Sequence, residues 1–121
     1  MDFRLTDHQE MLIDAARKIS EKQIQPLLAA RDARQPLSRA DVLEILSKAA
    51  DIGLTSARIP EEGGGAGMAM LDYGLVMEQM PPTVGLIVQP HEATTTRIYF
   101  GGSEEQKRRF VQGMMAGQLV G

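Results

Sequence analysis

Signals for the start of an α-helix stand at three places in the chain, and they constrain its fold more than any other feature. Thr6 and Gln9 have the spacing of a capping box, in which each side chain accepts a hydrogen bond from the other residue's backbone N–H. Ser103 and Gln106 repeat this pattern near the other end. Ser38 is an N-cap candidate before a third helical segment. These signals predict a chain that is built from helices.

Apolar residues follow the start signals at Thr6 and Ser38 at the spacing of one helical face. The first set predicts a helix from residue 7 towards residue 31, with a kink at Pro26, and the second predicts a helix over 39–52 that ends at Gly53. The apolar positions are Leu12, Ala15, Ala16, Ile19, Ile24, Leu27 and Leu28 in the first segment and Val42, Ile45, Leu46 and Ala49 in the second.

The middle of the chain predicts one long irregular segment, over residues 54–69. Pro60 favours an extended residue before it, and four glycines lie between residues 63 and 67. Glycine lets two backbone segments approach each other closely. We therefore expect a tight turn that packs against its own chain.

Three further helices are expected after this turn. They cover residues 70–80, residues 83–100 with an interruption at Pro90, and residues 104–117 with Gly117 as the cap. Residues 118–121 are expected to begin a strand. The whole chain, residues 1–121, is thus predicted to be one all-α domain, a bundle of five to six helices.

Composition excludes several classes of function. The chain has no cysteine, which excludes a disulfide scaffold, a thiol nucleophile and a cysteine-based zinc site. The net charge of −3 makes nucleic acid an unsuitable partner, because phosphate binding needs clustered positive charge. No apolar stretch approaches the ~20 residues that span a bilayer, and no secretory signal is present, so we expect a cytoplasmic protein without membrane insertion.

No residue pattern in the chain points to catalysis or to a bound cofactor. The glycine-rich turn has neither the Gly-Lys-Ser/Thr of a P-loop nor a complete GxGxxG. His8 and His91 lack metal-ligand spacing, and Glu104 and Glu105 suit the N-terminus of a helix. From these residues we assign no catalytic, cofactor-binding or metal-binding position.

Four segments, in order, nevertheless resemble the N-terminal helical domain of the acyl-CoA dehydrogenases. They are FRLTDHQEMLIDAARKIS, ADIGLTSARIPEEGGGAG, MLDYGLVMEQM and GGSEEQKRRFVQGMMAGQLVG. The glycine junction and the GSEEQK segment are the most specific of the four. Together they extend the resemblance over essentially the whole chain.

The resemblance implies an oxidoreductase of fatty acid metabolism with three domains, of which this chain would be the N-terminal fragment. Such flavoproteins are usually homotetramers with FAD that convert an acyl-CoA to the trans-2-enoyl-CoA. A glutamate takes the α-proton, flavin N5 accepts the β-hydride, and an electron-transfer flavoprotein is the implied electron acceptor. The glutamate and the main flavin segments of the family lie beyond Gly121. This piece is therefore expected neither to bind FAD nor to be catalytic alone.

The resemblance also implies that the fourth predicted helix, residues 83–100, lines the acyl cavity. The residues carried over as substrate-binding candidates are Leu86, Gln89, Pro90, Ala93 and Thr94. Two features depart from the family: Gly63 stands where an aromatic is common, and His91, Glu92 and Arg97 make this helix more polar than a fatty-acyl lining. We expect a short, polar or unusual acyl group. Two alternatives stay open, a non-catalytic helical interaction module and a homologue that acts on another thioester.

Overall fold

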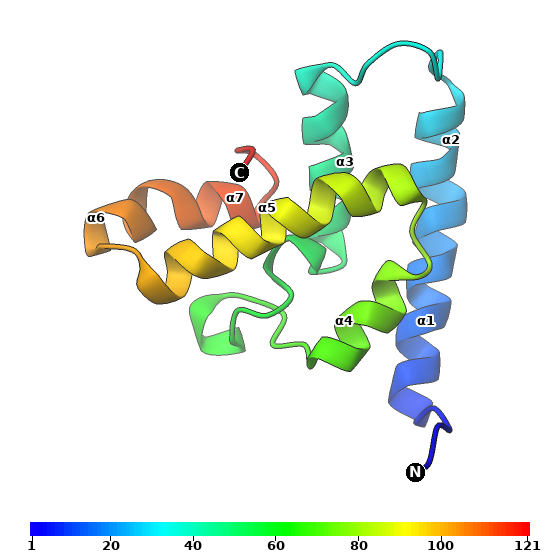
Figure 1. The fold of residues 1–121 in the computed structure, drawn as a ribbon, viewed down its shortest axis with the longest axis horizontal. Coiled ribbons are helices and arrows are strands. Elements are labelled where there is room, and N and C mark those ends of the chain that lie inside the picture. Colours follow the sequence, from blue (N-terminus) through cyan, green and yellow to red (C-terminus); the bar gives the residue numbers. More distant parts are fainter.

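The computed structural model describes all residues, 1–121, and contains helices but no strand (Figure 1). The first helical rod consists of α1 (Asp7–Ile19), a π-helical turn (Ser20–Ile24) and α2 (Gln25–Ala29). Its capping box is formed as predicted: the Gln9 backbone N–H donates to Thr6 Oγ1 at 3.2 Å, and the Thr6 N–H donates to Gln9 Oε1 at 3.0 Å.

Pro26 does not break this rod, because the turn before it widens. The backbone N–H of Gln25 donates to the carbonyl of Ser20, five residues earlier, and Pro26 then occupies the first turn of α2. Proline lacks an N–H and crowds the carbonyl four residues back in a regular α-helix, whereas the first helical turn tolerates it. The predicted kink is thus a local π-helical turn.

The second rod is α3 (Arg39–Asp51), which lies beside the first (Figure 1). Ser38 and Asp41 form a complete capping box, with Asp41 N–H to Ser38 Oγ at 3.1 Å and Ser38 N–H to Asp41 Oδ2 at 2.8 Å. Gly53 has a φ of 76°, the left-handed conformation predicted for the residue that ends this helix. Both ends of α3 are therefore as the sequence predicts.

The segment after α3 is irregular, as expected, yet part of it is among the most buried in the chain. Leu54–Ser56 forms a 3₁₀ turn, and Leu54, Ala57 and Ile59 are fully buried. The glycine turn folds back on this segment: a Cβ at Gly65 would lie 2.1 Å from the Ile59 carbonyl oxygen. The predicted close approach of two backbone segments is confirmed.

A side chain from a distant helix fills the space above Gly63. A Cβ on Gly63 would lie 2.3 Å from the Tyr99 hydroxyl oxygen, so the Tyr99 ring already occupies this position. The sequence resemblance implies an aromatic residue at the position of Gly63. Here the ring comes instead from the helix that packs over the turn.

The third and fourth rods are α4 (Met70–Met77) and α5 (Pro82–Gly101). The expected interruption at Pro90 is wrong, because α5 continues through it for 20 residues. The carbonyl that loses its helical partner belongs to Leu86, and both Leu86 and Pro90 are exposed residues on the solvent side of α5. Proline on the solvent side of a long helix is therefore tolerated here.

The last rod consists of α6 (Glu104–Gln106), a π-helical turn (Lys107–Val111) and α7 (Gln112–Met115). Gly117, with a φ of 69°, ends it as predicted. The strand expected over 118–121 is wrong: the backbone N–H of Gln118 donates to the Gly113 carbonyl at 2.8 Å and closes a turn. A strand needs a neighbouring strand for its hydrogen bonds, and these residues have none.

Five rods thus form the predicted all-α bundle, with α5 crossing its middle (Figure 1). α5 packs on α3 and on the 3₁₀ turn after it, while α4 packs on α1. None of the helices has the length and apolar character needed to cross a membrane. The main core cluster consists of Ala16, Ile24, Ile45, Leu46, Ala49, Leu54, Ala57, Tyr73, Val76, Met80, Val84 and Val88.

Candidate functional site

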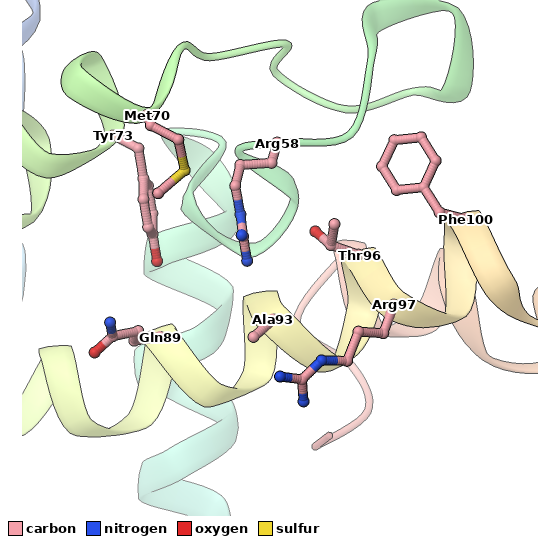
Figure 2. A pocket seen from close by; sticks show the side chains of 8 residues that line it. All are labelled: Arg58, Met70, Tyr73, Gln89, Ala93, Thr96, Arg97 and Phe100. Atoms are coloured by element: carbon pink, nitrogen blue, oxygen red, sulfur yellow. The ribbon is translucent and has the colours of Figure 1, made fainter.

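A pocket of about 410 Å³ opens between α4, α5 and the segment that carries Arg58. Figure 2 shows its side chains: α5 contributes one wall, and Arg58, Met70 and Tyr73 approach from the opposite side. The wall on α5 repeats at helical spacing, with Gln89, Ala93 and Phe100 on one face. The complete lining is Arg58, Met70, Tyr73, Gln89, Ala93, Thr96, Arg97 and Phe100.

An ion pair joins Arg58, which lines this pocket, to Glu92 of α5. The Glu92 side chain is completely buried, and the Arg58 guanidinium donates to it from Nε at 3.0 Å, with the Arg58 backbone N–H at 3.2 Å. The Thr96 hydroxyl donates to the same carboxylate at 2.8 Å. Hydrogen bonding to Glu92 raises the pKa of Arg58. The pair is therefore held rigidly, and its two charges balance.

Tyr73, which lines the same pocket, has a buried hydroxyl without a partner. The residue is only 6% exposed, and its oxygen forms no hydrogen bond within the protein. Burial, reinforced by the negative charge of Glu92, raises the pKa of Tyr73 to about 12. The phenol is thus protonated at neutral pH, and its hydroxyl is a buried polar group without a partner.

The structure places two of the five candidate residues in the pocket wall. Gln89 and Ala93 line it, whereas Leu86, Pro90 and Thr94 do not. Leu86 lies exposed on the turn of α5 before Gln89. Pro90 is on the solvent side, and Thr94 donates to the Pro90 carbonyl at 2.8 Å and lies near Gly121.

The polar residues of α5 are divided between the interior and the pocket. His91 is buried against the last rod: its Nδ1 accepts from the Gly121 N–H at 3.1 Å, and its Nε2 donates to the Met114 carbonyl at 2.7 Å. Burial lowers the pKa of His91. Of His91, Glu92 and Arg97, only Arg97 lines the pocket, so two of the three residues that suggested a polar acyl group do not support it.

Sequence reasoning missed five lining residues, namely Arg58, Met70, Tyr73, Thr96 and Phe100. Helical spacing was a usable signal for two of them, because Thr96 and Phe100 lie seven and eleven positions after Gln89. The other three come from α4 and from the segment before the glycine turn. Nothing local in the sequence brings these segments to α5.

The family model described as acyl-CoA dehydrogenase, N-terminal domain, matches residues 6–118, and the chain belongs to this family. It is 28% identical over its whole length to the short-chain specific acyl-CoA dehydrogenase of Clostridium acetobutylicum, covering 32% of that protein. It is 32% identical to the acryloyl-CoA reductase (NADH) of Anaerotignum propionicum, with 100% of this chain and 30% of that protein covered.

Among solved structures, butyryl-CoA dehydrogenase from Megasphaera elsdenii superposes with a TM-score of 0.75 at 28% identity, over 99% of this chain and 32% of that one. The chain thus spans about a third of the length of the proteins it matches. The similarity covers the helical bundle as a whole, including α4 and α5.

The glycine turn does not have the form of a cradle for the phosphates of FAD. The space beside Gly65 is filled by the backbone of Ile59, and the space beside Gly63 by Tyr99. A phosphate-binding glycine loop needs that space open so that its backbone N–H groups can face the ligand. The turn is a packing element, and the flavin does not fit there.

Proposed function

We propose that this chain forms one wall of the acyl-binding cavity of a FAD-dependent acyl-CoA dehydrogenase, which converts an acyl-CoA thioester to the trans-2-enoyl-CoA. The observation that carries the proposal is the pocket between α4 and α5, with Gln89 and Ala93 in its wall. Met70 and Phe100 give it apolar surface, and small-ligand sites are typically apolar with a few polar groups. Membership of the family supplies the reaction class.

In this proposal the chain supplies shape rather than reacting groups. The Arg58–Glu92 pair fixes the segment before the glycine turn against α5, and the small Ala93 side chain leaves room for the acyl group. The flavin and the base come from segments outside these 121 residues, in a three-domain enzyme. A homo-oligomer, an electron-transfer flavoprotein as acceptor and a cytoplasmic location belong to the same proposal.

The experiment uses the complete polypeptide that contains this chain, purified with its bound flavin. Dye reduction is measured with straight-chain acyl-CoA thioesters of increasing length. Ala93→Phe fills the pocket and is expected to lower kcat/KM by about tenfold or more for the longer chains. Flavin content should not change.

Ala40→Leu is the matched control, because Ala40 is an exposed helical alanine on α3, outside the pocket. It should leave kcat/KM at the level of the unmodified enzyme. Failure to oxidise any acyl-CoA would overturn the proposal, as would equal kcat/KM values for Ala93→Phe and Ala40→Leu.

The identity of 32% with an acryloyl-CoA reductase favours a second candidate, reduction of an enoyl-CoA. The same pocket would hold the acyl group in either direction. Supplying enoyl-CoA with a reduced electron donor, and acyl-CoA with an oxidising dye, measures both directions on one preparation. Turnover in the reductive direction alone would select the second candidate.

A further inference from the structure

His91 is a buried polar side chain on the side of α5 that faces away from the pocket. It is two positions from both Gln89 and Ala93, a rotation of about 200° around the helix. The residue is 1% exposed. Its Nε2 donates to the Met114 carbonyl at 2.7 Å, and its Nδ1 accepts from the backbone N–H of Gly121 at 3.1 Å. The imidazole therefore joins three parts of the chain, namely α5, the end of α7 and Gly121.

These two partners fix the protonation state of the ring. A backbone N–H can only donate, so Nδ1 carries no proton where it faces Gly121. A carbonyl can only accept, so Nε2 carries the proton where it faces Met114. A second proton would place an N–H on Nδ1 opposite the N–H of Gly121, and that hydrogen bond would be lost. The bond to Met114 would remain, so protonation acts on the contact with Gly121 alone.

The contact with His91 is what holds the chain at Gly121. The backbone N–H groups of residues 118 and 119 both donate to the Gly113 carbonyl of α7, at 2.8 and 3.1 Å. Residues 120 and 121 form a single hydrogen bond within the chain, the one from the Gly121 N–H to His91. Residues 118–120 are exposed, and the chain ends beside α5 and α7 (Figure 1). Without His91, the backbone after residue 119 would have no hydrogen-bonded anchor.

We infer that His91 is a positioning residue, which fixes the point where the polypeptide leaves the helical bundle relative to the pocket wall on the same helix. This inference rests on the proposed function, in which the segment after Gly121 continues into the rest of the enzyme. α5 then carries the acyl wall on one face and the anchor of the departing chain on the other. Neutral His91 holds the two in one fixed relation, and a proton on Nδ1 releases it.

The surroundings of His91 keep the ring neutral. Burial lowers the pKa of His91, while the bond to the Met114 carbonyl and the negative charge of Glu92 act in the opposite sense. Glu92 is itself paired with Arg58. α7, residues 117–121 and the 3₁₀ turn before Ala57 bring no ionisable side chain to the ring. The buried residues of α3 and of the π-helical turn before α7, which also pack on α5, are all apolar.

Hydrogen–deuterium exchange of the complete, flavin-loaded polypeptide, resolved to single residues by mass spectrometry, tests the anchor without any substrate. We expect the protection factor of the Gly121 amide to fall by about tenfold for each pH unit below the pKa of His91. The Gly117 amide is an internal control, because it donates to the same Met114 carbonyl at 3.1 Å. Its protection factor should not change over this range.

Two amide variants separate the two hydrogen bonds of the ring. His91→Asn keeps an acceptor for Gly121, His91→Gln keeps a donor for Met114, and neither side chain titrates. Protection of the Gly121 amide should persist in His91→Asn without the pH dependence and be lost in His91→Gln at every pH. His91→Gln should also lower kcat by about tenfold with KM within about twofold, because the pocket wall is intact while the departing chain is displaced. His8→Gln, at the exposed histidine of α1, is the control and should change neither.

The exchange measurement separates this inference from the proposed function. Protection of the Gly121 amide that is independent of pH, or that His91→Gln leaves intact, overturns the inference whether or not an acyl-CoA is oxidised. In an enzyme that oxidises acyl-CoA, equal kcat values for His91→Gln and His8→Gln also overturn it. Protection that is kept in His91→Asn and lost in His91→Gln supports the anchor even where no acyl-CoA is oxidised, and in that case the proposed function alone fails.

Discussion

Removal of the Arg58 side chain is expected to destabilise the chain strongly. Glu92 is completely buried on α5, and the Arg58 guanidinium is its only charged partner. Arg58→Met keeps much of the length of the side chain but leaves the carboxylate without a counter-charge. The buried carboxylate would keep two hydrogen-bond donors, the backbone N–H of residue 58 and the Thr96 hydroxyl.

The magnitude follows from the burial of the pair. Loss of one member of a buried ion pair costs about 3–5 kcal/mol, because the remaining charge is left uncompensated. The Arg58 side chain is 34% exposed, and Glu92 keeps two donors, so we expect about 3 kcal/mol. With an m-value of about 2 kcal/mol/M, the urea midpoint should fall by about 1.5 M.

The assay is urea unfolding of the chain, followed by far-UV circular dichroism. The double variant Arg58→Met with Glu92→Leu should recover most of the loss, because an apolar pair can replace a buried ion pair at little cost. Thr96→Val removes one hydrogen bond to the carboxylate and should cost about 1.5 kcal/mol. Thr94→Val is the control, since that hydroxyl bonds only the carbonyl of its own helix.

A midpoint for Arg58→Met within about 0.25 M of the unmodified chain, which is the range of an ordinary surface substitution, would refute the reasoning. A double variant as unstable as Arg58→Met would also refute it. The loss would then come from the packing of the arginine stem and not from the uncompensated charge of Glu92.

Three further predictions concern single residues. Gly65→Ala should lower the urea midpoint, because its Cβ would collide with the Ile59 backbone, whereas Gly74→Ala in α4 has open space and should add about 0.5–1 kcal/mol. Tyr73→Phe should not lower the midpoint and should raise stability by up to about 1 kcal/mol, since it removes an unpaired buried hydroxyl. Burial lowers the pKa of His91, so the unfolded chain binds more protons as the pH falls through about 6.5. The Tm of the chain should therefore decline between pH 7.5 and pH 5.5, and this decline should be smaller in the variant His91→Gln than in the unmodified chain.

The ends of helices were predictable because their determinants are local. A capping box needs two side chains three residues apart, and all three expected N-caps form, at Thr6, Ser38 and Ser103. Gly53 and Gly117 take the left-handed conformation expected at the other ends. Such positions depend on a few neighbouring residues, which the sequence states directly.

The effect of prolines was less predictable, because it depends on which side of a helix meets water. Pro26 is accommodated by a π-helical turn, and Pro90 leaves α5 continuous. Pro90 and Leu86, one turn earlier, both lie on the solvent side of α5, and which side of a helix faces solvent is a property of the packed bundle. The pairing of Arg58 with Glu92, 34 residues apart, likewise required the fold.

The candidate site shows how far helical geometry alone could have led. Successive residues of an α-helix are rotated by about 100°, so Gln89, Ala93, Thr96 and Phe100 project within about 60° of one another, and all four line the pocket. His91 and Glu92 fall on the face of Val88, which is the buried face of α5. The sequence-based prediction counted His91, Glu92 and Arg97 together, although they lie on two different faces of the helix. It therefore assigned His91 and Glu92 to a pocket lining to which they do not belong. When the positions are assigned to faces of the helix, the lining keeps Arg97 and loses His91 and Glu92, because only Arg97 lies beside the face of Gln89 and Ala93.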